Sequence, residues 1–534
     1  MPDLGLVLAL LAVIAFLAAI GRRLALPDPI VFALGGLVLA FVPALPRLAL
    51  QPSLVLVVFL PPLIFAEAQD TSWAEIRREA YPILLLAVGL VLGTMTVVAV
   101  VAHALAPDLP WAAAFTLGAI VAPPDTVAAK AIADTLRLPR RLVSILGGEG
   151  LVNDATALVA FQVASSIAVT GAAFAIGPTA LRGVYAAAAA VVIGLLVGWI
   201  GRQVLSRVGD SAVENTVTLL LPFAAFLPAE RVHASGVLAV LVLALYLSRF
   251  SVLAAASVSR SQGRVLWEMI EFLLTGLSFV LVGLQLPAVF AGLPHRPAGV
   301  VLTTVAVCLT VILVRPVWVF GMAWLSQAVQ HLLGESTLSV KPRTSVLAVL
   351  SWSGMRGVVS LAVALSLPHA TEAGQLFPGR HLIVFITFAL VLVTLIGQGL
   401  TLPALIRRLG VGALASRVED LEAAAELRMA RAAFGRLDVL AGEMGASGDV
   451  VERVRGFYAG RIERLEHYRQ LQASSVAHRA HHARVHDATR DLVGQLLEIE
   501  HAELQLIRNS GEVETPVAQR IQARLDALRL NDRR

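Results

Sequence analysis

Cysteine is almost absent from this chain: Cys308 is the only one among 534 residues, so no disulfide can form within it. Charged residues are also scarce, at 15% of the sequence, whereas hydrophobic residues make up 57%. A soluble globular domain rarely contains more than about 50% apolar residues. The scarcity of charge therefore argues against a soluble protein and indicates a chain that crosses a lipid bilayer several times.

The motifs of common enzyme and receptor classes are missing too. The sequence contains no glycine-rich nucleotide loop, no quartet of metal ligands and no catalytic triad. We therefore expect no enzymatic activity and no cofactor. The sequence pI near 9.8 would suggest nucleic-acid binding in a soluble protein. Here it is better explained by arginines in the loops of a membrane protein, so no nucleic-acid partner is expected.

Long apolar runs fill the chain up to about residue 409. A transmembrane helix needs roughly 20 apolar residues. The segments that meet this requirement are 4–21, 28–46, 52–68, 81–106, 111–133, 142–169, 181–204, 212–228, 235–250, 267–290, 298–327, 344–367 and 381–406. Because no basic residue precedes the first segment, we interpret it as a retained span and not as a signal peptide. The sequence thus predicts an all-α polytopic membrane domain of about thirteen helices over residues 1–410.

The basic residues between these segments predict the orientation of the chain. With the N-terminus outside, sixteen loop Arg and Lys residues fall on the cytoplasmic side and five on the opposite side. Cytoplasmic loops carry an excess of Arg and Lys. The bias supports an odd number of spans and a cytoplasmic C-terminus, and we expect the protein in the plasma membrane.

Residues 411–534 form a second, charge-dense domain with 18 Arg and 19 acidic residues. Apolar residues recur in it at helical spacing, which predicts amphipathic cytoplasmic helices with a regulatory role. Four histidines share one face of such a helix: His478, His481, His482 and His486. A cluster of this kind can titrate near neutral pH or bind a metal ion, but a solvated helix face is the favoured interpretation.

A carboxylate interrupts the fifth apolar segment. Asp125 directly follows Pro123 and Pro124, and Thr126 comes next. Proline frees backbone carbonyl groups, and within a bilayer such a break is tolerated only beside protein or a wet cavity. An aspartate at the break can share a small cation with the freed carbonyls. Ionisable residues at membrane depth are costly, and by default they mark an ion or proton path.

A second carboxylate lies in the sixth apolar segment. Asp154 follows Asn153, and Glu149 precedes Asn153 by one helical turn. The Asn-Asp pair supplies one negative charge and one neutral oxygen, a combination that holds either one monovalent cation or one proton. Burial disfavours the charged form of a carboxylate, so protons can compete with cations near neutral pH. Asp125 and Asp154 are therefore the expected cation ligands.

Two arginines lie within later apolar segments. Arg356 is flanked by Gly354 and Gly357, which predicts a second interrupted helix. Interrupted helices at corresponding places in two halves of a transporter point to its binding site. Arg315 lies in the eleventh segment. Because a buried Glu149 needs a cationic partner, we expect a structural ion pair with Arg315 or, as the second choice, with Arg356.

At these motifs the chain resembles the bacterial sodium/hydrogen exchangers of the cation:proton antiporter superfamily, the branch that includes the NhaP proteins and the animal exchangers. The resemblance covers the membrane domain and is carried by Gly118–Thr126, Gly148–Asp154 and Gly354–Ala362. It implies a homodimer with inverted repeats and crossed discontinuous helices, in which a core domain slides against a dimerisation domain. It also implies electroneutral exchange of one cation for one proton.

By the same resemblance Asp154 is the principal cation and proton carboxylate, and Asp125 supports it. Three positions depart from the family pattern. Gly150 stands where a serine is usual, so a hydroxyl that can bind the cation is missing, and Thr126 or a water can replace it. The acid usual after a Pro-Pro-aromatic motif is displaced to Glu67, which faces the same cavity or an interface. Thr275 replaces an asparagine.

The sequence therefore predicts a secondary antiporter that exchanges Na⁺ for H⁺ and serves pH and sodium homeostasis. The lipid bilayer, monovalent cations and a second copy of the chain are its expected partners. A K⁺/H⁺ antiporter on the same scaffold is the nearest alternative. A cation channel is less favoured, because a channel needs a continuous pore with several sites.

Overall fold

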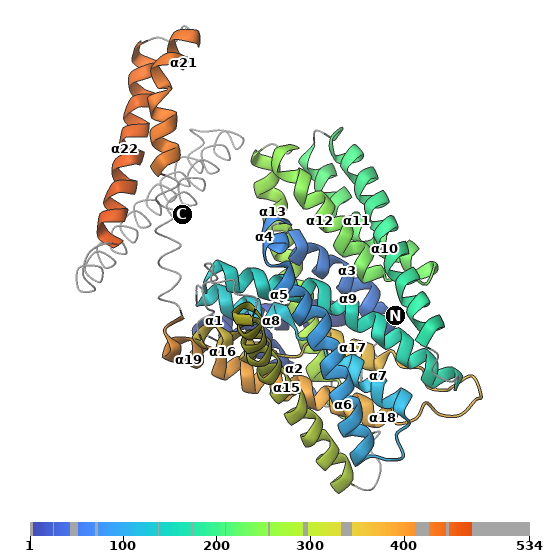
Figure 1. The fold of residues 1–534 in the computed structure, drawn as a ribbon. Helices are drawn as coiled ribbons and strands as arrows, with labels where there is room; N and C mark the ends of the chain where they lie inside the picture. The colour runs from blue at the N-terminus through green and yellow to red at the C-terminus, as the bar shows by residue number, and fades with distance from the viewer. Residues whose placement is uncertain are drawn as a thin grey trace. The chain divides into compact units, whose positions relative to one another are not determined.

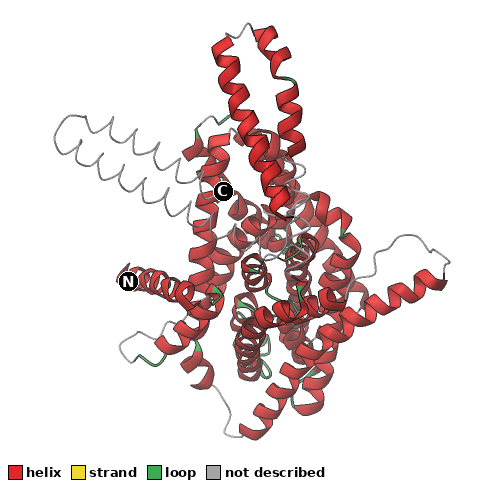
Figure 2. Ribbon diagram, turned by 90° about the vertical axis from the view of Figure 1, so that its left-hand side faces the viewer, coloured by secondary structure: helices red, strands yellow, loops and turns green. Residues whose placement is uncertain are grey.

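The computed structural model describes residues 4–24, 26–42, 52–69, 73–136, 138–171, 176–208, 210–254, 257–291, 297–332, 344–411, 427–444 and 448–472. Within these residues the chain consists of helices and short connections, without a β-strand (Figure 2). The predicted all-α class is confirmed. The chain divides into two compact units, Met1–Ala415 and Ser416–Arg534.

The helices of the first unit follow the predicted apolar segments in order (Figure 1). They are α1 (Leu4–Leu24), α2 (Asp28–Leu39), α3 (Pro52–Gln69), α4 (Trp73–Arg78), α5 (Ala80–Leu84), η1 (Leu85–Leu90), α6 (Val91–Leu105), α7 (Trp111–Val121), α8 (Thr126–Thr135), α9 (Arg140–Thr170), α10 (Ile176–Leu205), α11 (Ser211–Arg231), α12 (Gly236–Ala254), α13 (Ser257–Leu284), α14 (Leu286–Ala291), α15 (Pro297–Leu332), α16 (Thr344–Trp352), α17 (Val358–Leu365), α18 (Arg380–Leu392), η2 (Val393–Gln398) and α19 (Gly399–Leu409). The two η segments are π-helical turns within longer helices.

Several of these helices are suited to a bilayer by length and composition. In the part of the chain that the structure describes, eight helical stretches are long and apolar enough to cross a membrane. Shorter apolar helices cover Asp28–Leu39, Val57–Gln69 and Gly236–Arg249. The chain is a multi-pass membrane protein, while the count of thirteen crossings stays a prediction.

Two membrane helices are interrupted where the sequence predicts it. The segment between α7 and α8 contains Pro123 and Pro124, which lack the backbone N–H that would continue the helix. The segment between α16 and α17 runs through Gly354 and Gly357, and the backbone at Gly357 is extended, with φ −131° and ψ −159°. The two unwound segments therefore have backbone groups that need partners outside their own helices.

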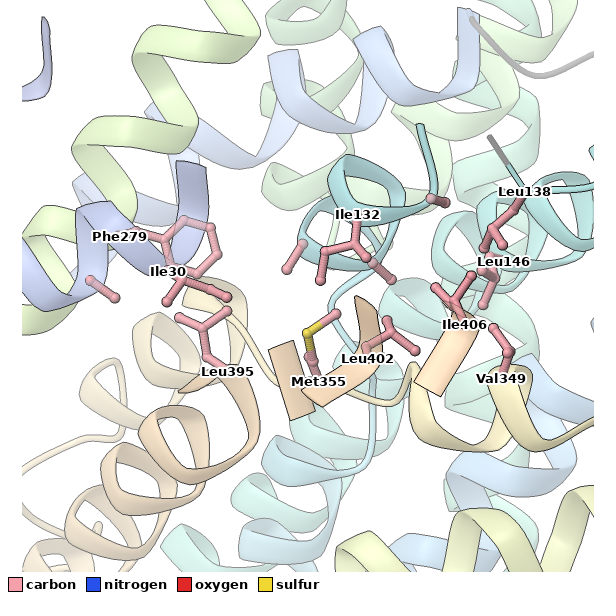
Figure 3. Close-up of a cluster of buried hydrophobic side chains, with 14 of the residues drawn as sticks. Ile30, Ile132, Leu138, Leu146, Phe279, Val349, Met355, Leu395, Leu402 and Ile406 are labelled. Carbon is pink, nitrogen blue, oxygen red and sulfur yellow. The ribbon is translucent and has the colours of Figure 1, made fainter. Parts of the chain in front are cut away.

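A large apolar cluster holds the second unwound segment in place. Met355 from this segment is fully buried between Ile30 of α2, Leu395 of η2 and Leu402 of α19 (Figure 3). Side chains of α1, η1, α8, α9, α13, α15 and α16 also belong to the cluster. Burying apolar surface of this kind contributes roughly 25 cal/mol per Å², so the Met355 side chain anchors a segment that has few helical hydrogen bonds of its own.

The second unit contains α21 (Leu437–Met444) and α22 (Gly448–Gln472), and residues 427–435 are also helical. Arg455 of α22 pairs with Asp438 of α21 at 2.8 Å, and Arg431 pairs with Glu466. These side chains are largely exposed, so each pair contributes little stability. The four clustered histidines of the sequence lie outside the described residues.

Candidate functional site

The two unwound segments meet each other inside the membrane unit. The backbone N–H of Asp125 donates to the carbonyl oxygen of Met355 at 2.7 Å. A Cβ atom on Gly357 would overlap the carboxylate of Asp125, so a residue without a side chain is needed where the segments cross. The structure thus brings together the two breaks that lie more than 200 residues apart in the sequence.

Arg356 joins the two segments through backbone carbonyls. Its Nε donates to Val121 at 2.8 Å and its Nη2 to Ala122 at 3.0 Å, and its Nη1 donates to Gly354. The side chain is 2% exposed. Arg356 therefore binds the last carbonyls of α7, where helix hydrogen bonding has ended, and its positive charge lies at the negative end of the helix dipole.

This arrangement differs from one expectation. Arg356 bonds to carbonyls and does not serve as the partner of Glu149, the second choice made from the sequence. That the freed carbonyls share a cation with Asp125 stays a prediction: Val121 and Ala122 accept from Arg356, and each carbonyl oxygen keeps a second lone pair. Arg356 bonds to carbonyls because a buried guanidinium has five donors to satisfy and the carbonyls at a helix end are the nearest acceptors.

Glu149 of α9 forms its ion pair with Arg315 of α15. The Nη2 of Arg315 donates to Oε2 of Glu149 at 2.8 Å, Nη1 donates to Oε1, and Nε donates to the carbonyl of Leu350 at 3.0 Å. The Arg315 and Glu149 side chains are 3% and 0% exposed. A bidentate pair of this kind satisfies both charges and fixes α9 against α15 and α16.

Asn153 and Asp154 lie next to this crossing. The Nδ2 of Asn153 donates to the carbonyl of Pro124 at 3.2 Å, which ties α9 to the first unwound segment. Its Oδ1 is buried and accepts no hydrogen bond from the described residues. Asp154 lines a small pocket between α7, α9 and α17, together with apolar side chains and Ser360. An unpartnered amide oxygen is thus adjacent in sequence to a carboxylate that faces a pocket.

The other two acids near the crossing are held by hydrogen bonds. The Oδ1 of Asp125 accepts from the backbone N–H groups of Val127 at 2.9 Å and Ala128 at 3.5 Å, and so caps α8. Glu67 of α3 accepts from the hydroxyl of Thr126 at 2.6 Å. The charges of Glu67 and Asp125 both act on Asp154, so the three carboxylates form one electrostatically coupled group.

Gly150 provides the space that Thr126 occupies. A Cβ atom on Gly150 would overlap both Cγ2 and Oγ1 of Thr126, so α8 approaches α9 closely at this point. The Thr126 hydroxyl therefore fills the place that a side chain at position 150 would take. This explains in steric terms why the chain has glycine here, and it keeps a hydroxyl oxygen beside Asp125.

We expect Gly150→Ala to destabilise the protein by about 1–3 kcal/mol, because the added methyl group overlaps a side chain that is packed on all sides. Thermal unfolding in detergent measures the change, and Thr126→Gly in the same chain should recover part of it. Gly321→Ala on α15 is the matched control, since a Cβ there meets no atom within 4 Å. Equal melting temperatures for Gly150→Ala and the unmodified chain would contradict the steric account.

Some residues of the site had no signal in the sequence. Thr394, in the π-helical η2, accepts from the backbone N–H of Arg356 at 3.0 Å and so holds the unwound segment. In the sequence, Thr394 is only a hydroxyl residue within an apolar run. Many such residues bond to a carbonyl of their own helix, so the sequence did not indicate its role at the site. Ser360 joins Asp154 at the pocket because α17 packs against α7 (Figure 1).

A multi-pass helical protein in which two interrupted helices cross beside a group of buried and half-buried carboxylates belongs to the ion-carrier class. A family model described as "Sodium/hydrogen exchanger, transmembrane" matches residues 9–408. The chain is similar to an uncharacterised Na⁺/H⁺ exchanger of Mycobacterium tuberculosis. The two sequences are 34% identical over 98% of this chain and 96% of the relative. Over 75% of the chain, 34% of residues are identical to a sodium, potassium, lithium and rubidium/H⁺ antiporter of Bacillus pumilus, covered to 60%.

Among solved structures, the sodium proton antiporter MjNhaP1 from Methanocaldococcus jannaschii matches with a TM-score of 0.59 and 19% identity, over 76% of this chain and 98% of that one. This likeness shows the fold. The family match and the Mycobacterium tuberculosis relative show that the chain belongs to the transmembrane sodium/hydrogen exchanger family. The protein is a monovalent cation/proton antiporter, and the resemblance stated from the sequence motifs is confirmed.

Proposed function

We propose that the protein exchanges one Na⁺ for one H⁺ without net charge movement, with Asp154 as the carboxylate that binds either ion. The observation that supports this proposal is a difference in the surroundings of the three acids Glu67, Asp125 and Asp154. Glu67 and Asp125 accept hydrogen bonds from Thr126 and from the start of α8, whereas Asp154 lines the pocket. One carboxylate in contact with the pocket supports competition between one cation and one proton.

The remaining ligands of the cation are neutral oxygens in this proposal. The Oδ1 of Asn153 is buried without a partner among the described residues, and a cation supplies the missing interaction. The hydroxyl of Thr126 donates a hydrogen bond to Glu67, so the lone pairs of its oxygen remain for other contacts. Oxygen ligands with one negative charge suit a small monovalent cation.

The setting of this activity is proposed from the sequence. The excess of Arg and Lys in one set of loops supports an outside N-terminus and a cytoplasmic tail in the plasma membrane. The family resemblance supports a homodimer, a sliding core and a role in sodium and pH homeostasis. The regulatory role of residues 411–534 is part of the same proposal, as is their separation from the membrane domain.

Potassium is the second candidate for the exchanged cation. The Bacillus pumilus relative, 34% identical over 75% of the chain, is named for exchange of sodium, potassium, lithium and rubidium. A K⁺/H⁺ antiporter therefore stands beside the Na⁺/H⁺ antiporter as a proposal on the same site.

We expect sealed proteoliposomes containing the protein to release protons when Na⁺ is added, at a rate that an imposed membrane voltage does not change. A pH-sensitive dye inside the vesicles measures the flux, and Na⁺, K⁺ and Li⁺ are compared at equal concentration. Protein-free vesicles are the control. A rate that rises with voltage would contradict electroneutral exchange, and a response to K⁺ alone would replace Na⁺ by K⁺ in the proposal.

A further inference from the structure

One face of α13 is polar from the exposed Arg264 to the interior of the membrane unit. Arg264, Glu268, Glu271, Thr275 and Ser278 follow one another at spacings of three or four residues, which places them on one side of the helix. The Arg264 and Glu268 side chains form an ion pair and are 79% and 60% exposed. Thr275 and Ser278 are only 8% and 2% exposed. Exposure therefore falls steadily along this α13 polar face.

The two buried hydroxyls at its inner end have no hydrogen-bond partner among the described residues. Two other buried hydroxyls of the membrane unit bond to the carbonyl four residues earlier, Thr304 to Val300 and Thr387 to Ile383. Leaving a buried hydroxyl unpaired is costly, because the group has lost its hydrogen bonds to water. Two such groups, three residues apart on one face, indicate that water or a passing ion completes their bonding.

The α13 polar face lies against the helix that carries Glu67. The ring of Trp267, one turn before Glu271, packs on Phe65 of α3 with ring centroids 5.0 Å apart. Glu67 in turn holds Thr126 beside Asp125. The α13 polar face therefore lies against the helix whose carboxylate, Glu67, contacts the first unwound segment.

The opposite face of α13 has a different role. Gly276 packs on Ile14 and Phe32, and the carbonyl of Val280 lies against Gly36. These contacts with α1 and α2 are close and apolar, and they exclude water. Only the polar face of α13 can therefore line an aqueous route.

We propose that the α13 polar face lines a hydrated route along which cations and protons pass between the cytoplasm and the crossing, with Thr275 and Ser278 as its inner lining. This inference rests on the proposed antiport function and on the predicted orientation, in which the start of α13 is cytoplasmic. The hydroxyls replace part of the hydration shell of a cation as it leaves the exposed Arg264–Glu268 end. They act on ion access, whereas Asp154 binds the ion.

Cysteine labelling tests the route directly. In a Cys308→Ala background, Thr275→Cys and Ser278→Cys are treated with a cationic methanethiosulfonate in inside-out vesicles, with Val280→Cys on the apolar face as the matched control. We expect labelling of positions 275 and 278 to be about tenfold faster or more, because a thiol reacts as the thiolate and dry burial suppresses that form. Labelling no faster than at position 280 would overturn the proposal.

The same labelling in an Asp154→Asn chain separates this inference from the function. We expect the rates to be unchanged there, because access to the route does not require exchange. A second measurement uses Thr275→Val combined with Ser278→Ala, which removes both unpaired hydroxyls while keeping the approximate shape of the face. We expect equal or higher thermal stability but severalfold slower exchange, whereas Thr304→Val on α15 should change neither. Full exchange by the double variant would also overturn the proposal.

Discussion

Replacing Asp154 by Asn is expected to reduce cation-driven proton flux to the rate of protein-free vesicles while the protein stays folded. The amide has almost the same shape as the carboxylate, so packing around the pocket of Ala119, Phe161 and Val359 is kept. It carries no charge and binds no proton in the physiological range, so neither half of the exchange cycle has its ligand. Flux into sealed proteoliposomes measures the effect, and size-exclusion profile and melting temperature in detergent establish the fold.

The matched control for this prediction is Asp210→Asn. Asp210 caps α11 by accepting from the backbone N–H groups of Ala212 at 2.9 Å and Val213 at 3.0 Å, and it is exposed. Asparagine caps a helix about as well as aspartate, so exchange by this variant should equal that of the unmodified chain. Wild-type flux from Asp154→Asn would remove Asp154 from its proposed role and leave Asp125 or Glu67 as the ion-binding carboxylate.

The fold was accessible from the sequence because its main signals are local. The length of an apolar run determines whether a helix can cross the bilayer, and proline or glycine within the run determines where that helix breaks. The interruptions after Val121 and after Trp352 follow from Pro123, Pro124 and the glycines around Arg356. The sequence also predicted that both breaks belong to one site, because paired helix interruptions in transporters lie at the substrate-binding site.

The partners of buried charges were less accessible, because they depend on which face of a helix a residue occupies and on which helix lies opposite. Arg315 and Arg356 are both buried cations in apolar runs, and hydropathy does not distinguish them. The structure does: Arg315 bonds to Glu149, and Arg356 bonds to carbonyls at the end of α7. The sequence likewise does not predict that Thr126 packs into the space beside Gly150, because this contact is made between two different helices.

The distinction between Arg315 and Arg356 leads to the largest expected change in stability. We expect Glu149→Gln to lower the free energy of unfolding by about 3–5 kcal/mol, because it leaves the guanidinium of Arg315 buried without a counter-charge. The carbonyl of Leu350 still accepts from Nε of Arg315, but a neutral acceptor does not balance the charge. Urea or thermal unfolding in detergent measures the loss, which appears even in a variant that no longer transports.

Two further variants show whether the loss comes from the pair. Glu149→Gln combined with Arg315→Met removes both charges, and it should recover most of the stability because replacing a buried pair by apolar groups is often neutral. Glu268→Gln, which breaks the exposed pair with Arg264, should change stability by less than about 1 kcal/mol. If Glu149→Gln were as mild as Glu268→Gln, the Arg315–Glu149 pair would not support the fold, and the position of α9 against α15 would have to depend on apolar packing.

A full recovery in the double variant together with restored exchange would show that the pair serves stability alone. Recovery of stability without exchange would show that its charges also position Asn153 and Asp154, one turn further along α9.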